Sequence, residues 1–168
     1  MIAITEVTET DLPVIQTIAH QTWPSTFGEI LSPSQIRYML EMMYSLDALK
    51  SQINEKKHVF LLAKDEISNE YLGYISYELH YKGESVTKVH KIYMLPASQG
   101  KGVGRLLIDN VAERAIQQAD NRLGLNVNRY NRAVQFYERM GFVVIGQEDI
   151  DIGDGFLMED FIMEKRLN

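Results

Sequence analysis

The sequence predicts an α/β domain built on a mixed β-sheet. Three observations support this fold class. Runs with the apolar–polar alternation of strands occupy the centre of the chain. A glycine-rich loop at residues 99–104 follows them and leads into apolar residues at helical spacing. Further strand-like runs close the chain, so antiparallel strands and strand–helix units are expected to share one sheet.

Length and composition are those of a globular protein with a single domain over residues 1–168. A chain of this size buries a sufficient core without disulfides or metal ions. Apolar residues make up 45% and charged residues 24%, which are ordinary values for a soluble fold. Glycines and prolines are scattered, so no linker or repeat divides the chain.

The residue counts also exclude several classes of protein. The chain has no cysteine, which rules out disulfide frameworks, thiolate metal sites and a cysteine nucleophile. Its net charge of −6 is opposite in sign to that of a typical nucleic-acid binder, so no nucleic-acid partner is expected. No stretch reaches the roughly 18 apolar residues of a membrane span, and the N-terminus lacks a basic leader. We therefore expect a cytoplasmic protein with no membrane association.

The N-terminal third predicts one strand and three helices. Residues 2–7 alternate like a strand, and Thr10 then caps a helix whose apolar residues recur at helical spacing. The Ser-Pro pair at 32–33 begins the second helix, because proline at the first helical position loses no hydrogen bond. A break near Ser45 separates this helix from a third at 46–55.

The middle of the chain predicts three consecutive strands. Residues 58–64 and 71–81 form a hairpin around the turn-forming stretch 67–70. Residues 87–95 add the third strand, which runs directly toward the glycine-rich loop. The order of these segments along the chain favours antiparallel neighbours.

The C-terminal part alternates helices and strands. A helix is predicted at 103–115, a strand at 122–127 and a second helix at 133–140, where Gly141 occupies the usual position of a C-terminal glycine. Two last strands are predicted at 142–146 and 156–165.

The glycine-rich loop is suited to a phosphate group. Glycines allow a tight turn and a close approach of the backbone to a ligand, and the first N–H groups of the following helix lack partners. Together with the helix dipole they favour a phosphate or pyrophosphate, and Lys101 and Arg105 add positive charge. The pattern matches neither the nucleoside triphosphatase loop nor the dinucleotide-binding fingerprint.

Two motifs carry a resemblance to a known family. Q-G-K-G-V-G at 99–104 resembles the [RQ]-x-x-G-x-[GA] signature of the GNAT superfamily of N-acetyltransferases, and N-R-A-V-Q-F-Y-E-R-M-G-F at 131–142 resembles its second conserved segment. The order of elements is similar over nearly the whole chain. Residues 22–36 and 149–165 resemble the polyamine (spermidine/spermine) N-acetyltransferase-like group.

This resemblance implies a fold and a function. The fold would be the GNAT fold, with a mixed, mostly antiparallel sheet of six to seven strands, a central parallel strand pair that splays apart, and about four flanking helices. The function would be direct transfer of acetyl from acetyl-CoA, the cosubstrate, to a primary amine of a small cationic acceptor such as a polyamine. Homodimers are frequent in this family, which favours a homodimer here.

The resemblance also implies the residues that bind the coenzyme. Ile92, Tyr93 and Met94 would hold the pantetheine arm through their backbone. Asn131 would assist, although the family's asparagine more often lies where this chain has Tyr130, which leaves Asn128 as an alternative. The residues implied for the pyrophosphate are Gln99, Gly100, Lys101, Gly102, Val103, Gly104 and Arg105.

Acetyl transfer to an amine requires a proton donor and a proton acceptor. Tyr137 matches the family's tyrosine near the coenzyme sulfur and would protonate the leaving thiolate, although a tyrosine at helical spacing also fits simple packing. His90 lies on the strand before the loop, and its ordinary pKa near 6.5 suits a base acting directly or through water. Glu78 on the neighbouring strand competes for this role, and a packed histidine is the alternative.

The expected acceptor contacts are partly acidic and partly aromatic. Asp151 and Asp154 belong to a carboxylate-rich turn that would attract a cation, although a solvated surface turn explains it equally well. Trp23 and Phe27 would wall the acceptor pocket or close the core, and Glu78 would add a charge. The acidic turn lacks the terminal glutamate of a calcium loop, so no metal is expected.

Other functions remain open at this level. An acetyl-CoA-binding regulatory module without catalysis would keep the loop but not the roles of Tyr137 and His90. An acetyltransferase of a protein N-terminus or an amino-acid-like amine would share the coenzyme site. An interaction protein with an accidental glycine loop would bind no coenzyme.

Overall fold

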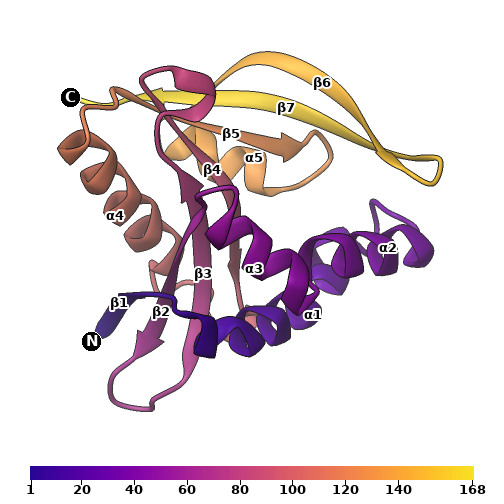
Figure 1. Cartoon of the computed structure of the whole chain (residues 1–168), viewed down its shortest axis with the longest axis horizontal. Coiled ribbons are helices and arrows are strands. Elements are labelled where there is room, and N and C mark those ends of the chain that lie inside the picture. The colour runs from indigo at the N-terminus through magenta and orange to yellow at the C-terminus, as the bar shows by residue number, and fades with distance from the viewer.

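A computed structural model describes residues 1–168 as one seven-stranded sheet flanked by five α-helices (Figure 1). The predicted mixed α/β fold is confirmed, with five helices in place of about four. The strands are β1 (Ile2–Glu6), β2 (Val59–Asp65), β3 (Tyr71–Glu78), β4 (Val86–Met94), β5 (Arg122–Asn128), β6 (Val143–Gly153) and β7 (Phe156–Arg166). The helices are α1 (Leu12–Phe27), α2 (Pro33–Tyr44), α3 (Leu46–Asn54), α4 (Val103–Gln117) and α5 (Ala133–Arg139).

The strand order β1-β2-β3-β4-β5-β7-β6 places the one parallel pair, β4 and β5, at the centre. Residues 86–89 of β4 pair with residues 122–125 of β5, and the pairing ends there. Beyond this point β4 continues to Met94 beside β3, whereas β5 continues to Asn128 beside β7. The predicted splayed pair is therefore present, and it opens a gap in the middle of the sheet.

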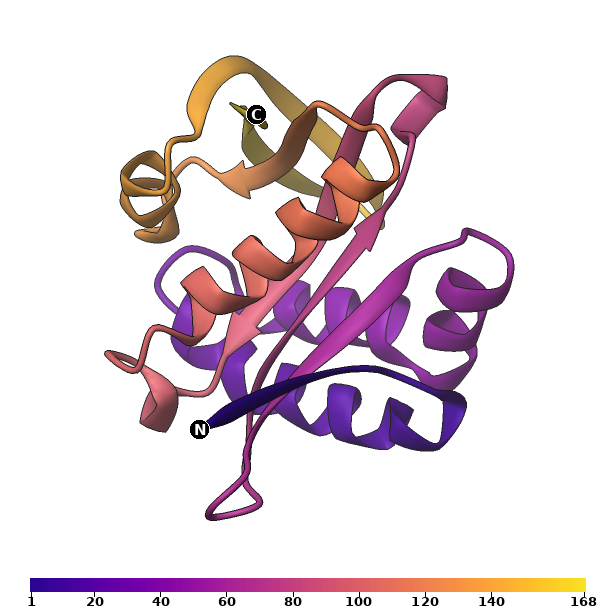
Figure 2. The same ribbon diagram turned by 90° about the vertical axis from the view of Figure 1, so that its left-hand side faces the viewer.

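The two faces of the sheet carry separate cores. Helices α4 and α5 cover one face, and α1, α2 and α3 cover the other, as Figure 2 shows from the side. The alternation within β2 explains this division, because Leu61 packs under α4 while Phe60 and Leu62 pack under the N-terminal helices. No helix of the structure has the length and apolarity needed to cross a membrane.

The beginning of α1 differs from the expectation. Thr8, not Thr10, begins the helical segment: its backbone N–H donates to the Asp11 carboxylate at 2.9 Å, and a 3₁₀ turn at Glu9–Asp11 precedes α1. The helix also runs further than the apolar stripe suggested and reaches Phe27. Trp23 and Phe27 therefore lie within the last turns of α1.

The two later N-terminal helices begin as predicted. The Ser32 hydroxyl oxygen accepts a hydrogen bond from the Gln35 N–H at 3.1 Å, and the Ser45 hydroxyl oxygen accepts one from the Ala48 N–H at 3.2 Å. Each serine satisfies a backbone donor that the helix leaves free. Ser45 thus ends α2 and begins α3 at the predicted break.

A β-bulge interrupts β4 next to the splayed region. Tyr77 of β3 pairs with Val89, and the next pair is Ser76 with Lys91, so His90 is the extra residue. Bulges bend a strand and re-aim its side chains. This bulge immediately follows the last paired residue of β4 and β5.

Candidate active site

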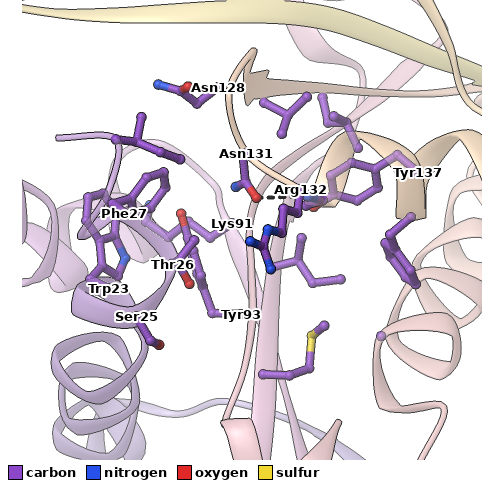
Figure 3. A pocket seen from close by; sticks show the side chains of 18 of the residues that line it. Trp23, Ser25, Thr26, Phe27, Lys91, Tyr93, Asn128, Asn131, Arg132 and Tyr137 are labelled. Atoms are coloured by element: carbon purple, nitrogen blue, oxygen red, sulfur yellow. Dashed lines mark hydrogen bonds between the residues drawn. The ribbon is translucent and has the colours of Figure 1, made fainter. Parts of the chain in front are cut away.

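The gap between β4 and β5 opens into a cleft of about 1330 Å³. Its walls come from β4, the glycine-rich loop, α5, the end of α1 and the β6–β7 hairpin. In Figure 3, Trp23 and Phe27 lie across this cleft from Arg132 and Tyr137. Segments that are distant in sequence therefore meet around one space.

The glycine-rich loop forms one end of the cleft. Gly100 and Gly102 adopt φ values of 79° and 72°, which residues with a side chain rarely do. Gly102 directly precedes α4, so the free N–H groups of that helix's first turn lie in the loop. A Cβ on Gly104 would come within 3.0 Å of the Met94 and Phe136 side chains, both of which line the cleft. The loop therefore requires glycine for its shape and its packing.

Positive charge surrounds this end. Arg105, Arg132 and Arg139 line the cleft, and they supplement the helix dipole at the start of α4. Phosphate groups are bound by this combination of backbone donors and guanidinium groups. Of the residues predicted for the pyrophosphate, Gln99, Gly100, Gly102, Val103, Gly104 and Arg105 line the cleft, whereas Lys101 does not.

The free edge of β4 forms the floor of the cleft. Ile92, Tyr93 and Met94 line it after β5 has turned away. Backbone groups on that edge have no strand partner, so they suit an extended ligand that carries amides. These residues fit the predicted pantetheine contacts.

Asn131 and Asn128 both line the cleft. The Asn131 side-chain oxygen accepts a hydrogen bond from the Ala133 N–H at 2.9 Å at the start of α5, and Asn128 does the same for the Tyr130 N–H at 3.0 Å. Each amide oxygen therefore stabilises a turn. The Nδ2 group of Asn131 donates no hydrogen bond within the protein, so it is available to a ligand.

Tyr137 lies on α5 with its ring against Phe136 and Phe142. The side chain is 6% exposed and lines the cleft. Burial raises the pKa of Tyr137 well above its usual value, and no hydrogen bond opposes this effect. The phenol stays protonated at neutral pH, as a proton donor must.

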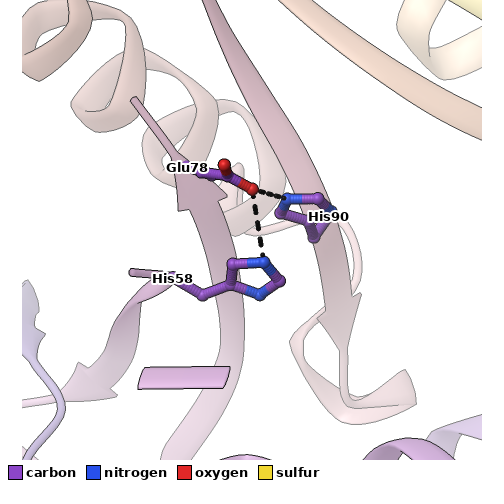
Figure 4. A group of neighbouring side chains, drawn as sticks. All are labelled: His58, Glu78 and His90. Carbon is purple, nitrogen blue, oxygen red and sulfur yellow. Dashed lines mark hydrogen bonds and ion pairs between the residues drawn. The ribbon is translucent and has the colours of Figure 1, made fainter. Parts of the chain in front are cut away.

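His90 belongs to a cluster with Glu78 and His58 (Figure 4). The Nε2 atoms of His90 and His58 lie 3.0 and 3.4 Å from the same Glu78 oxygen, and the two rings stack with centroids 4.0 Å apart. Both Nε2 atoms face one Glu78 oxygen from nearly parallel rings, which fits two N–H donors on one carboxylate better than two lone pairs that converge on a metal ion. Of the three residues, only His90 lines the cleft.

Burial changes the proton affinities in this cluster. It lowers the pKa of His90 to about 2, with further lowering by the charges of His58 and Lys91. It lowers the pKa of His58 to about 4 and raises the pKa of Glu78 above its usual value. Both imidazoles are therefore neutral at physiological pH, and Glu78 becomes a stronger base than an exposed glutamate.

The far end of the cleft has an aromatic and aliphatic lining. The Trp23 ring lies 4.6 Å from Phe27 and 5.8 Å from Tyr93, measured between centroids. Trp23 and Phe27 both line the cleft and both belong to the core on this face of the sheet. The two alternatives for these residues, a pocket wall and a core contact, are therefore compatible. The remaining apolar lining on this side consists of Ile30, Met39, Met42, Met43, Ile150, Ile152 and Met158.

The carboxylates of the β6–β7 hairpin mostly face elsewhere. Asp151 and Asp154 are exposed and do not line the cleft, and the Asp151 carboxylate accepts a hydrogen bond from the Gly153 N–H at 2.9 Å. Asp149 pairs with Arg129 at 2.8 Å. Asp160 is the one member of the acidic segment that lines the cleft.

The model of the acetyltransferase (GNAT) domain matches residues 29–165 of this chain. The chain belongs to the GNAT family. It is an N-acetyltransferase, and the cleft between β4 and β5 brings together its glycine-rich loop, Tyr137 and the aromatic side chains of Trp23 and Phe27.

Relatives of this GNAT protein align with it over nearly their full length. An N-acetyltransferase from the pepI 3′ region of Lactobacillus delbrueckii subsp. lactis is 27% identical over 99% of this chain and 98% of its own. The PaiA N-acetyltransferase of Thermoplasma acidophilum, solved in complex with coenzyme A, superposes with a TM-score of 0.82 at 24% identity, covering 99% of both chains. The spermidine/spermine N-acetyltransferase SpeG of Vibrio cholerae superposes with a TM-score of 0.67 at 19% identity, covering 99% of this chain and 95% of its own.

Several residues of the GNAT cleft were not among the predicted ones. Arg132 and Arg139 lie within the second motif, and their positive charge was the available signal. Lys91 and Asp160 lie in strands that also carry apolar residues, Lys91 before Ile92 and Asp160 before Phe161, but nothing in the sequence marked their side chains as facing inward. Which side faces the cleft could not be read from alternation alone.

Proposed function

We propose that this protein transfers acetyl from acetyl-CoA directly to the primary amine of a small cationic acceptor, with polyamines as the first acceptors to test. One observation carries the proposal: a single cleft joins a phosphate-suited loop at one end to an enclosed chamber with an inward carboxylate at the other. Between them lie the free edge of β4 and the Tyr137 side chain. A donor and an acceptor would therefore meet within the gap in the sheet.

The coenzyme supplies an activated thioester. The loop from Gln99 to Arg105 would bind its pyrophosphate, and the backbone of Ile92, Tyr93 and Met94 would hold the pantetheine arm. The amine nitrogen forms the new C–N bond to the acetyl carbonyl carbon as the C–S bond breaks. Tyr137 would donate its phenolic proton to the departing thiolate, and the proton that the amine nitrogen loses as the amide forms would restore the phenol.

The ammonium must lose a proton before it attacks. An alkylammonium with a pKa near 10.4 pays about 4 to 5 kcal/mol for deprotonation at pH 7. His90 is in the cleft, and since its Nε2–H donates to Glu78, its Nδ1 carries the lone pair. We propose that Nδ1 takes the amine proton as the Nε2 proton passes to Glu78, whose raised pKa makes it the better final acceptor.

A coenzyme-release assay tests the proposal. The protein is mixed with acetyl-CoA and one class of amine at a time: polyamines, amino-acid amides or peptides with free N-termini. The free thiol of the released coenzyme is then measured. The chain has no cysteine, so the protein gives no background in a thiol assay. We expect thiol release that depends on a polyamine, together with an acetylated product.

Each alternative function predicts a different result. Tight binding of acetyl-CoA without thiol release for any amine would establish a binding module. Release only with peptides or amino-acid amides would refute the polyamine assignment but not acetyl transfer. No binding of acetyl-CoA would refute the enzymatic function altogether.

A further inference from the structure

Asp160 is a carboxylate enclosed at the acceptor end of the cleft. It lies on β7, opposite Asn128 of β5 and Glu148 of β6, and is 6% exposed. The next residue, Phe161, packs toward the core beneath α4 and α5. Because strand side chains alternate, Asp160 faces the opposite way, into the cleft.

The hydrogen bonds of Asp160 leave one oxygen without a partner. Oδ2 accepts a hydrogen bond from the Asn126 amide at 3.3 Å. Oδ1 is buried and has no hydrogen-bond partner. A buried carboxylate oxygen without a donor is costly, so a protein rarely keeps one unless something else binds there.

The neighbouring cations are occupied by other groups. Lys88 donates to the Asn126 side-chain oxygen, and Arg129 pairs with Asp149 at 2.8 Å. Arg129 reaches Asp160 only at its backbone oxygen, at 3.4 Å. Neither cation satisfies Oδ1. Burial raises the pKa of Asp160 and the nearby Glu148 carboxylate raises it as well, while the Asn126 hydrogen bond and the charges of Lys88 and Arg129 oppose this only in part.

Asp160 shares the cleft with residues of β4 and of the β6–β7 hairpin. Burial raises the pKa of Tyr93, and the nearby groups that raise it further include Tyr137 and Asp160. Tyr93 lies on β4 and lines the same cleft as Asp160. The apolar side chains of Ile152 and Met158 line the cleft beside Asp160. A buried carboxylate oxygen that lacks a donor, with apolar side chains among its neighbours, suits one cationic nitrogen.

We propose that Oδ1 of Asp160 binds the ammonium group of the acceptor and thereby selects amines that enter the cleft as cations. This inference rests on the proposed function and assigns its acceptor recognition to one atom. It replaces the exposed hairpin carboxylates Asp151 and Asp154 as the recognition element. Glu29, the other carboxylate that lines the cleft, is exposed and lies at its rim.

The test separates binding from catalysis. Binding of spermidine, and of a tertiary alkylamine that cannot be stably acetylated, is measured by calorimetry on the protein saturated with coenzyme A. The variant Asp160→Asn keeps the shape of the side chain and removes its charge. The control Asp109→Asn removes the same charge from the exposed side of α4.

We expect Asp160→Asn to raise the dissociation constant of both amines at least tenfold, while Asp109→Asn and the affinity for coenzyme A stay unchanged. In turnover with an active amine, KM should rise tenfold with kcat within threefold. Unchanged amine affinity in Asp160→Asn would overturn the proposal. So would a loss of kcat with unchanged KM, because Asp160 would then be a base and not an anchor.

Two further outcomes are informative. Loss of amine binding in Asp160→Asn, in a protein that acetylates none of the amines, would support the anchor and refute the proposed reaction. If Asp160→Asn does not fold, Asp160→Glu keeps the charge and displaces it by one methylene. Weakened amine binding in that variant supports the anchor, and unchanged binding contradicts it.

Discussion

Lys91 is a lysine that the fold removes almost completely from water. It is 6% exposed, and its ammonium donates to the Gln52 side-chain oxygen at 2.7 Å. The rings of Tyr44 and Phe60 lie 5.7 and 5.6 Å from the same nitrogen. Burial lowers the pKa of Lys91 to about 7, and the charge of Lys56 lowers it further in the same direction.

This shift makes the stability of the protein depend on pH in a defined direction. An unfolded lysine keeps its ordinary pKa near 10.4, so between pH 7 and pH 10 the unfolded chain binds a proton that folded Lys91 does not. The free energy of unfolding should therefore rise with pH by about 1.4 kcal/mol per unit, or about 3 kcal/mol from pH 7.5 to 9.5. The gain in the free energy of unfolding is complete above the pKa of the unfolded lysine, and it is lost as the pH falls toward the lowered pKa of folded Lys91.

The variant Lys91→Met isolates this contribution. Methionine fills a similar volume without a charge, and it leaves the Gln52 oxygen without its donor at a cost of about 1 kcal/mol. Urea unfolding at pH 7.5, 8.5 and 9.5 is compared for the wild type, Lys91→Met and the exposed control Lys50→Met on α3. Lys50→Met should keep the slope of the wild type, since that side chain is exposed to water in the folded protein as well.

We expect Lys91→Met to lower the slope by about 1.4 kcal/mol per pH unit and to be the more stable protein at pH 7.5. Equal slopes for the wild type and Lys91→Met would refute the reasoning, because Lys91 would then be protonated in the folded protein throughout this range. The result bears on the acceptor, since a neutral Lys91 does not repel a cation that enters the cleft.

The other predictions concern the reaction and the coenzyme. Tyr137→Phe should lower kcat about 100-fold or more with unchanged affinity for acetyl-CoA, and unchanged turnover would remove Tyr137 from the mechanism. In the wild type, kcat/KM should rise as the pH passes upward through the raised pKa of Glu78, and Glu78→Gln should abolish this rise. His90→Ala should also lower the rate. A pH–rate profile that neither variant alters would contradict both roles. Gly73→Ala should lower the free energy of unfolding by about 1 to 3 kcal/mol and weaken acetyl-CoA binding, because its Cβ would lie 2.6 Å from the Tyr93 carbonyl oxygen. Urea unfolding measures the effect of Gly73→Ala on stability, and calorimetry measures its effect on acetyl-CoA binding. Wild-type values for both would show that β4 can shift to accommodate the methyl group, and would contradict the prediction.

Local sequence signals predicted the elements well. The serines at 32 and 45 cap helices as expected, because capping depends only on neighbours along the chain. Gly100 and Gly102 adopt the backbone angles that favour glycine. The start of α1 was misplaced, since Thr8 and Thr10 are both able to cap and the choice depends on the Asp11 carboxylate.

Contacts between distant segments were not predictable in this way. His58 stacks on His90 because β2 and β4 flank β3, and the bulge at His90 directs its ring at Glu78. Strict alternation along β4 would put His90 on the same face as Ile92 and Met94, but the bulge at His90 changes that phase. Burial in the cluster then lowers the pKa of His90 far below the value near 6.5 expected for an exposed histidine.

The coenzyme end of the cleft was determined by the sequence itself. Strand, loop and helix follow one another without interruption, so glycine positions and helix dipole assemble the phosphate-suited loop through local geometry. The acceptor end was decided only by the tertiary structure. Its walls come from α1, β4 and the β6–β7 hairpin, and the register of β7 against β5 turns Asp160 inward while Asp151 and Asp154 face water. Charge alone predicted an acidic acceptor site, but strand pairing selects which carboxylate of this segment lines the cleft.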